Sequence, residues 1–113
     1  MSELVYVQRL IMAIVDALAA AHVEVQALED DGHVISGRDD YYDYVFEWRP
    51  ISGQQLREAR ADEAYHVKTN VVAARPLGAA RTFGRHLELE HVILNAIIAE
   101  RDASAGMREK KRT

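Results

Sequence analysis

Two Glu-x-x-His motifs are the pattern in this chain whose residue types and spacing could do chemistry. Glu63 and His66 form the first motif, and Glu88 and His91 form the second. On a helix, a spacing of three residues places both side chains on one face, and carboxylate di-metal sites use this arrangement. The motifs lie at equal distances on either side of Leu77, so an antiparallel helical hairpin turning there would bring them to one level. These four residues are therefore a candidate metal site, although the sequence shows no further bridging carboxylates from other helices.

The rest of the sequence carries no recognisable catalytic motif. The chain has no cysteine, which excludes a disulfide framework, a cysteine nucleophile and a cysteine-based zinc site. The phosphate-binding, serine-hydrolase and metalloprotease signatures are absent, and His22, His33 and His86 have no partner at a metal-binding spacing. We therefore predict no catalytic residues and no cofactor, and the sequence favours a protein that is not an enzyme.

Aromatic residues concentrate in residues 41–48, which hold five of the chain's eight. Strand alternation places Tyr42, Tyr44, Phe46 and Trp48 on one face of this segment and the acidic residues on the other. We expect the aromatic face to pack against the first helix, since the acidic surroundings repel nucleic acid. The residues expected to bind a partner lie on the other face and in the preceding turn: Tyr41, Asp43, Glu47, Asp39 and Asp40.

Helices and a meander are the elements that must position these residues. Residues 3–21 and 79–102 have helical patterns, and residues 22–48 indicate a three-stranded antiparallel β-meander. Residues 54–65 are predicted to form a further helix. Residues 66–74 suit either a helix or a fourth strand, and we assign them to helix.

Turn signals fix the predicted pairing within the meander. Asp31 and Gly32 are a favoured pair for a two-residue type I′ hairpin turn, and this turn pairs Glu29 with Val34. A second turn is expected at residues 37–40. Proline cannot donate to a ladder, so the third strand is expected to stop at Pro50.

The predicted fold is α+β. An N-terminal helix packs on the three-stranded antiparallel meander, and a C-terminal helical hairpin follows, with residues 66–74 as the alternative fourth strand. Residues 1–103 are expected to form a single domain, and residues 104–113 a basic, disordered tail.

Both strong helices are apolar on more than one side. One small sheet face cannot cover so much hydrophobic surface, so we expect the remainder to be buried between two copies of the chain. The predicted dimer interface consists of Leu4, Val7, Ile11, Ile14, Leu94 and Ile98.

Charge is divided unevenly along the chain, whose formal net charge is −4. Residues 22–48 carry eight acids and one base, whereas residues 49–113 carry twelve bases and eight acids. This division favours a non-enzymatic protein–protein interaction module, homodimeric, whose acidic sheet surface meets a basic partner. The alternatives are an inhibitor from a phage or mobile element that mimics nucleic-acid charge, a small di-metal carboxylate protein, and nucleic-acid binding through the basic C-terminal half.

Composition sets the expected location. No apolar run approaches the roughly 20 residues that a membrane span needs, and the acidic N-terminus is unlike a signal peptide. We therefore expect a cytoplasmic protein without a membrane partner. Its 11 arginines, 3 lysines and 17 alanines are typical of bacterial or phage proteins with GC-rich genes.

Overall fold

The computed structural model describes residues 3–50, 65–74, 76 and 84–112, and the side chains of 5–50, 65–74, 76 and 84–103. Its elements are, in order, α1 (Glu3–Ala20), β1 (Glu24–Glu29), the short 3-10 turn η1 (Asp30–Gly32), β2 (Val34–Arg38), β3 (Tyr42–Pro50), β4 (Tyr65–Ala74) and α2 (Arg85–Arg112).

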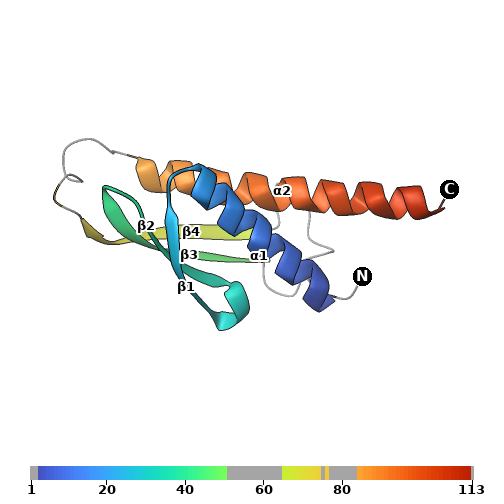
Figure 1. Cartoon of the computed structure of the whole chain (residues 1–113), viewed down its shortest axis with the longest axis horizontal. Coiled ribbons are helices and arrows are strands. Elements are labelled where there is room, and N and C mark those ends of the chain that lie inside the picture. The colour runs from blue at the N-terminus through green and yellow to red at the C-terminus, as the bar shows by residue number, and fades with distance from the viewer. Residues whose placement is uncertain (1–2, 51–64, 75, 77–83, 113) are drawn as a thin grey trace.

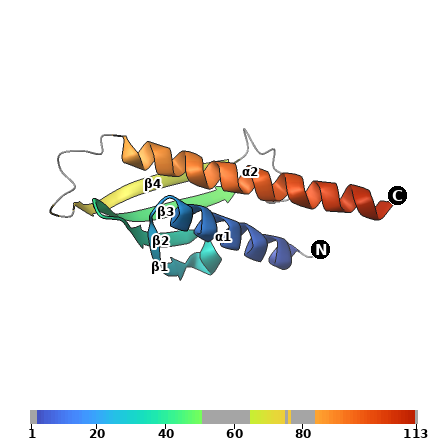
Figure 2. The ribbon, with the colours of Figure 1, turned by 45° about the horizontal axis from the view of Figure 1, so that its top comes forward.

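The strands form one antiparallel sheet in the order β1-β2-β3-β4. Both helices lie across the same face of this sheet and run in opposite directions, as Figures 1 and 2 show. The α+β class is therefore confirmed, with a four-stranded sheet in place of the three-stranded meander.

The assignment of residues 66–74 to a helix is wrong, because Tyr65–Ala74 is strand β4. It pairs with β3 from Tyr42 opposite Ala74 to Pro50 opposite Tyr65, with one register shift that leaves Val72 without a partner on β3. The β-branched residues of this segment favour a pleated strand. Strand β3 would also have an unpaired edge if this segment were a helix, and pairing with β4 satisfies the N–H and C=O groups of that edge. The predicted helical hairpin is consequently not formed by these residues. The predicted helix at 54–65 lies outside the described residues except for Tyr65, which begins β4.

The predicted hairpin turn at Asp31 and Gly32 is present, but the connection spans residues 30–33, because Asp30 also has a positive φ of 51° and the strands end at Glu29 and Val34. The φ angles of Asp31 and Gly32 are 54° and 88°, and the His33 N–H donates to the Asp30 carbonyl at 3.0 Å. Both positive angles are those that a type I′ turn requires. The predicted pairing of Glu29 with Val34 is also present.

The second turn begins later than predicted, because Gly37 and Arg38 still belong to β2. A Cβ atom on Gly37 would lie 2.9 Å from Cγ1 of Val23 and 3.2 Å from Cε2 of Phe46. The glycine therefore allows close packing inside the sheet rather than a turn. The connection between β2 and β3 is left to residues 39–41.

The core lies between the helices and the inner face of the sheet. On both helices the buried residues recur every four positions, which is the stripe expected for a helix packed on one side. Tyr44, Phe46 and Trp48 are at most 1% exposed, so the predicted packing of the aromatic face is confirmed. Among the described side chains, the others that are fully buried are Leu10, Ile14, Leu18, Val23, Ile35, Leu89, Ile93 and Ile97.

Helix α2 is 28 residues long and extends past the end of the sheet (Figure 1). Its backbone continues through the predicted disordered tail as far as Arg112, since residues 107–111 are mostly good helix formers. Among the described residues, neither helix is both long and apolar enough to cross a membrane.

Candidate functional site

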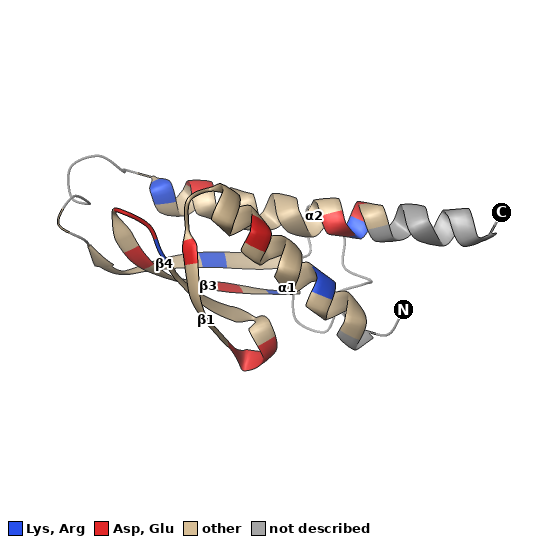
Figure 3. Cartoon of the chain, viewed as in Figure 1, with Lys and Arg blue, Asp and Glu red and all other residues tan. Residues whose placement is uncertain are grey.

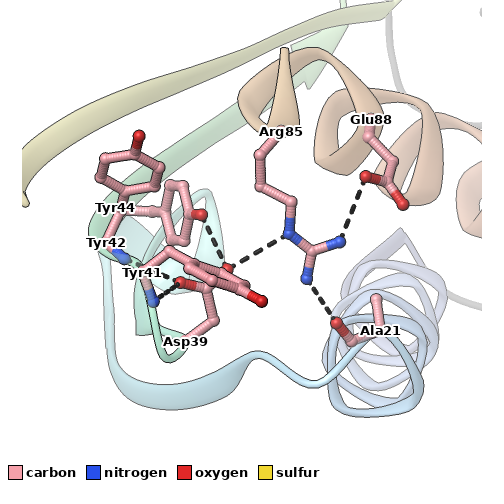
Figure 4. A network of polar contacts seen from close by, with 7 residues as sticks. All are labelled: Ala21, Asp39, Tyr41, Tyr42, Tyr44, Arg85 and Glu88. Carbon is pink, nitrogen blue, oxygen red and sulfur yellow. Dashed lines mark hydrogen bonds and ion pairs between the residues drawn. The ribbon is translucent and has the colours of Figure 1, made fainter. Parts of the chain in front are cut away.

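A buried carboxylate at the start of the connection between β2 and β3 organises the most polar part of the interior. The Oδ1 atom of Asp39 accepts hydrogen bonds from the backbone N–H groups of Tyr41 and Tyr42, both at 2.8 Å. Its Oδ2 atom accepts from the Tyr44 hydroxyl at 2.7 Å and from Nε of Arg85 at 3.2 Å (Figure 4). The side chain is 3% exposed, so one carboxylate with four donors holds the turn closed.

Arg85, in the first turn of α2, connects three elements through one guanidinium. Nε donates to Asp39, Nη2 donates to the Ala21 carbonyl at 2.6 Å, and Nη1 lies 3.3 Å from the Glu88 carboxylate. The end of α1, the β2–β3 connection and the start of α2 therefore meet at this residue, as Figure 4 shows. A planar guanidinium suits this role because it presents several donors in fixed directions.

The network shifts the pKa values of its members. Burial alone would raise the pKa of Asp39, but the hydrogen bonds from Tyr42, Tyr44, Tyr41 and Arg85 outweigh it and hold the pKa below its ordinary value. Burial and the neighbouring carboxylate raise the pKa of Tyr44 far above its ordinary value. Burial opposes the charge of Arg85, yet its bonds to Asp39 and Glu88 raise its pKa. The ion pair thus stays charged at neutral pH.

A pocket of about 340 Å³ adjoins this network and is lined by His22, Asp39, Asp40, Tyr41, Arg85 and Glu88. The Asp39 oxygens and the three Arg85 nitrogens already have partners within the chain. A bound substrate would have to compete with these bonds. The arrangement therefore serves to hold the elements together.

The structure separates the predicted partner-binding residues into two places. Asp39, Asp40 and Tyr41 lie at the pocket, where Asp39 is buried and Asp40 is exposed. Asp43 and Glu47 lie on the face of the sheet turned away from the helices. There, Asp43 forms an ion pair with Arg38 at 3.5 Å, and Glu47 is opposite Lys68 of β4.

The predicted metal site required both Glu-x-x-His motifs to lie on helices, and the structure does not show this arrangement. His66 lies on a strand and His91 on α2, and Glu88 is paired with Arg85. Glu63 lies outside the described residues. Within the described part of the chain, no three His, Cys, Asp or Glu side chains come close enough together to hold a metal ion.

The predicted dimer residues also have different environments. Ile14 is fully buried within one chain, and Val7 and Ile11 pack against its core. Leu94 and Ile98 are half-buried on α2. Leu4 belongs to α1, but its side chain is not among those described.

Exposed acids gather at the β1 edge of the sheet rather than around Asp39. This acidic edge comprises Glu24 and Glu29 of β1 and Asp30 and Asp31 of η1, all exposed (Figure 3). Arg49 forms an ion pair with Asp30 at 3.0 Å, and Arg38 is opposite Glu24 in the strand register.

Two residues of importance were missed by sequence reasoning. Arg85 meets Asp39 across 46 positions, and Glu90 accepts a hydrogen bond from the Thr69 N–H at 2.7 Å across 21. No local pattern links such distant partners. The role of Asp39 had a usable signal, because an aspartate at the start of a turn commonly binds the following amides.

The chain was compared with protein-family models, with curated proteins and with solved structures. None of the three comparisons finds a match.

Proposed function

We propose that this protein is a non-enzymatic protein–protein interaction module that acts as a homodimer and binds a basic partner. One observation carries the proposal: three of the six exposed large apolar side chains on the described surface belong to β4 and the start of α2, and four exposed acids lie along β1 and η1. Val71, Val72 and Leu87 are 46%, 63% and 53% exposed. Large apolar side chains that gather on a surface typically mark contact with another protein.

The acidic edge supports the choice of a basic partner. Glu29 and Asp31 are exposed at the end of β1 and in the η1 turn, on either side of the exposed Asp30. Like charges gathered on one edge raise the rate of encounter with a cationic surface and disfavour anionic ones. Asp43 and Glu47 support such a surface less well, because basic side chains lie beside them.

The Asp39 network supports a binding role over a catalytic one. Its ion pair and hydrogen bonds fix the ends of α1, α2 and the β2–β3 connection relative to each other. A rigid scaffold keeps interaction surfaces in a constant geometry and lowers the entropic cost of binding.

A cationic probe tests the acidic edge. The affinity of a fluorescent oligolysine peptide would be measured by anisotropy at low ionic strength and at about 0.15 M salt. We expect Glu29→Lys and Asp31→Lys to weaken binding several-fold more than the control Asp16→Lys, which makes the same charge change on α1. Equal losses in all three variants would show attraction by net charge alone and would refute a binding edge.

A further inference from the structure

We propose that a second copy of this chain docks along one side of the molecule, where β4 and α2 lie together. This β4–α2 side consists of Val71 and Val72 of β4 and Leu87, Leu94 and Ile98 of α2. The inference rests on the proposed function, since it identifies the surface through which the homodimer forms.

The strand component is the outer edge of β4. In the described sheet, β4 has a strand neighbour on one side only, which is β3. An edge strand presents N–H and C=O groups that pair readily with another chain. Val71 and Val72 are exposed, and residues 69–74 carry no charge. The second half of β4 is therefore an apolar and neutral edge.

The opposite edge of the sheet is protected by contrast. Both edge strands contain a register shift, β1 between Val25 and Ala27 and β4 at Val72, so the edges differ in length and charge instead. Strand β1 has six residues with glutamates at both ends, whereas β4 has ten residues. Short length and charges are features by which natural edge strands avoid pairing, and β4 is therefore the edge better suited to association.

The helix component is the side of α2 that faces the β4 edge. The hydrogen bond from the Thr69 N–H to Oε1 of Glu90 directs the Glu90 side of α2 toward that edge. Leu87 and Leu94 lie three residues before and four residues after Glu90, so they share its side of the helix, and Ile98 follows one turn later. The side toward α1 is different: Glu100 lies 3.9 Å from Arg9 there.

A second copy fits this side because the surface is complementary to itself. Two-fold pairing of β4 centred on Val71 would place Asn70 opposite Val72 and Lys68 opposite Ala74, so no like charges would face each other. Glu90 occupies the Thr69 N–H and β4 has a register shift at Val72, which together confine the new ladder to a few residues. The strand alone is thus too small for a stable interface of about 800 Å² per partner, and the leucine and isoleucine stripe of α2 supplies the remainder.

Sedimentation equilibrium of the full chain, with charge placed on and off this side, tests the proposal. Val72→Glu and Leu87→Glu are expected to raise the dimer dissociation constant by about tenfold or more, because each puts a carboxylate in an apolar contact. Met12→Glu on α1 and Leu28→Glu on β1 are matched controls at positions 66% and 50% exposed. They are expected to change the constant by less than about twofold.

The possible results distinguish an error in the proposed dimer surface from an error in the proposed homodimer. A dimer that Val72→Glu and Leu87→Glu leave unchanged would overturn this surface while the homodimer stands. A wild-type chain that stays monomeric would overturn both the homodimer and this dimer surface. That result would also cover the case in which a different protein binds the β4–α2 side. Val72→Thr keeps the branched shape needed in a strand, so a weaker dimer in this variant would show that the loss is not caused by misfolding.

Discussion

At the scale of single residues, Asp39 has the most demanding environment in the described chain. A carboxylate that is 3% exposed would be costly without partners, and four donors with one positive charge offset that cost. The same bonds close the β2–β3 connection and attach it to α2. Asp39 therefore converts a surface turn into a fixed junction of three elements.

Replacing Asp39 by asparagine tests this role. Asp39→Asn removes the buried one of the two carboxylates that pair with Arg85 and is expected to lower the free energy of unfolding by about 1.5–3 kcal/mol at pH 7. Urea denaturation followed by circular dichroism measures the change. Asp40→Asn, at the exposed neighbouring position, is the control and should stay within about 0.5 kcal/mol of the wild type.

The pH dependence of stability follows from the lowered pKa of Asp39. A carboxyl whose pKa is lower in the folded state than its unfolded value of about 3.9 stabilises the fold above that value. This stabilisation is lost as the pH falls through the folded pKa. The stability difference between wild type and Asp39→Asn should therefore shrink below about pH 4, and a difference that is constant from pH 7 to pH 3 would contradict the assignment.

At the scale of elements, the sequence predicted those whose signals are local. The two helices, the turn at Asp31 and Gly32 and the aromatic strand follow from periodicity and turn chemistry within short windows. Residues 66–74 were assigned wrongly because their state depends on β3, which lies far away in the sequence. The pairing of Asp39 with Arg85 depends on the tertiary fold in the same way.

The η1 turn offers a test of how elements dock. Gly32 has φ 88°, and a Cβ atom there would overlap the side chain of Ile11 on α1. Gly84 has a similar φ of 86°, yet a Cβ atom there meets nothing within 4 Å. Alanine substitutions at Gly32 and Gly84 therefore share the same backbone strain, and only the substitution at Gly32 adds steric overlap.

Both alanine variants should lose about 1–2 kcal/mol from the left-handed backbone. Gly32→Ala should lose a further 1–3 kcal/mol, roughly, because α1 and η1 must move apart. Thermal or urea unfolding measures both losses. Equal losses in the two variants would show that Ile11 yields without cost and that the close docking of η1 on α1 is not a constraint.

At the scale of the whole molecule, two surfaces differ in chemistry. Val71, Val72 and Leu87 are exposed on the β4–α2 side, four exposed acids lie along β1 and η1, and the junction at Asp39 and Arg85 connects the elements between them. Exposed apolar side chains also occur elsewhere, at Met12 and Leu28. Sequence reasoning predicted excess apolar surface and an excess of acids. Sequence reasoning did not locate the apolar surface or the acidic surface correctly. Ile14, predicted at the dimer interface, is buried in the core, and Glu47, predicted to bind a basic partner, lies opposite Lys68 of β4.

Hydrogen exchange of the full chain at low and high micromolar concentration tests the central claim most directly. If two copies pair through β4, backbone amides in residues 71–74 should exchange more slowly at the higher concentration, while residues 25–28 on the opposite edge exchange at the same rate in both samples. Identical exchange of residues 71–74 at the two concentrations, or equal protection of both edges, would contradict the proposed dimer surface.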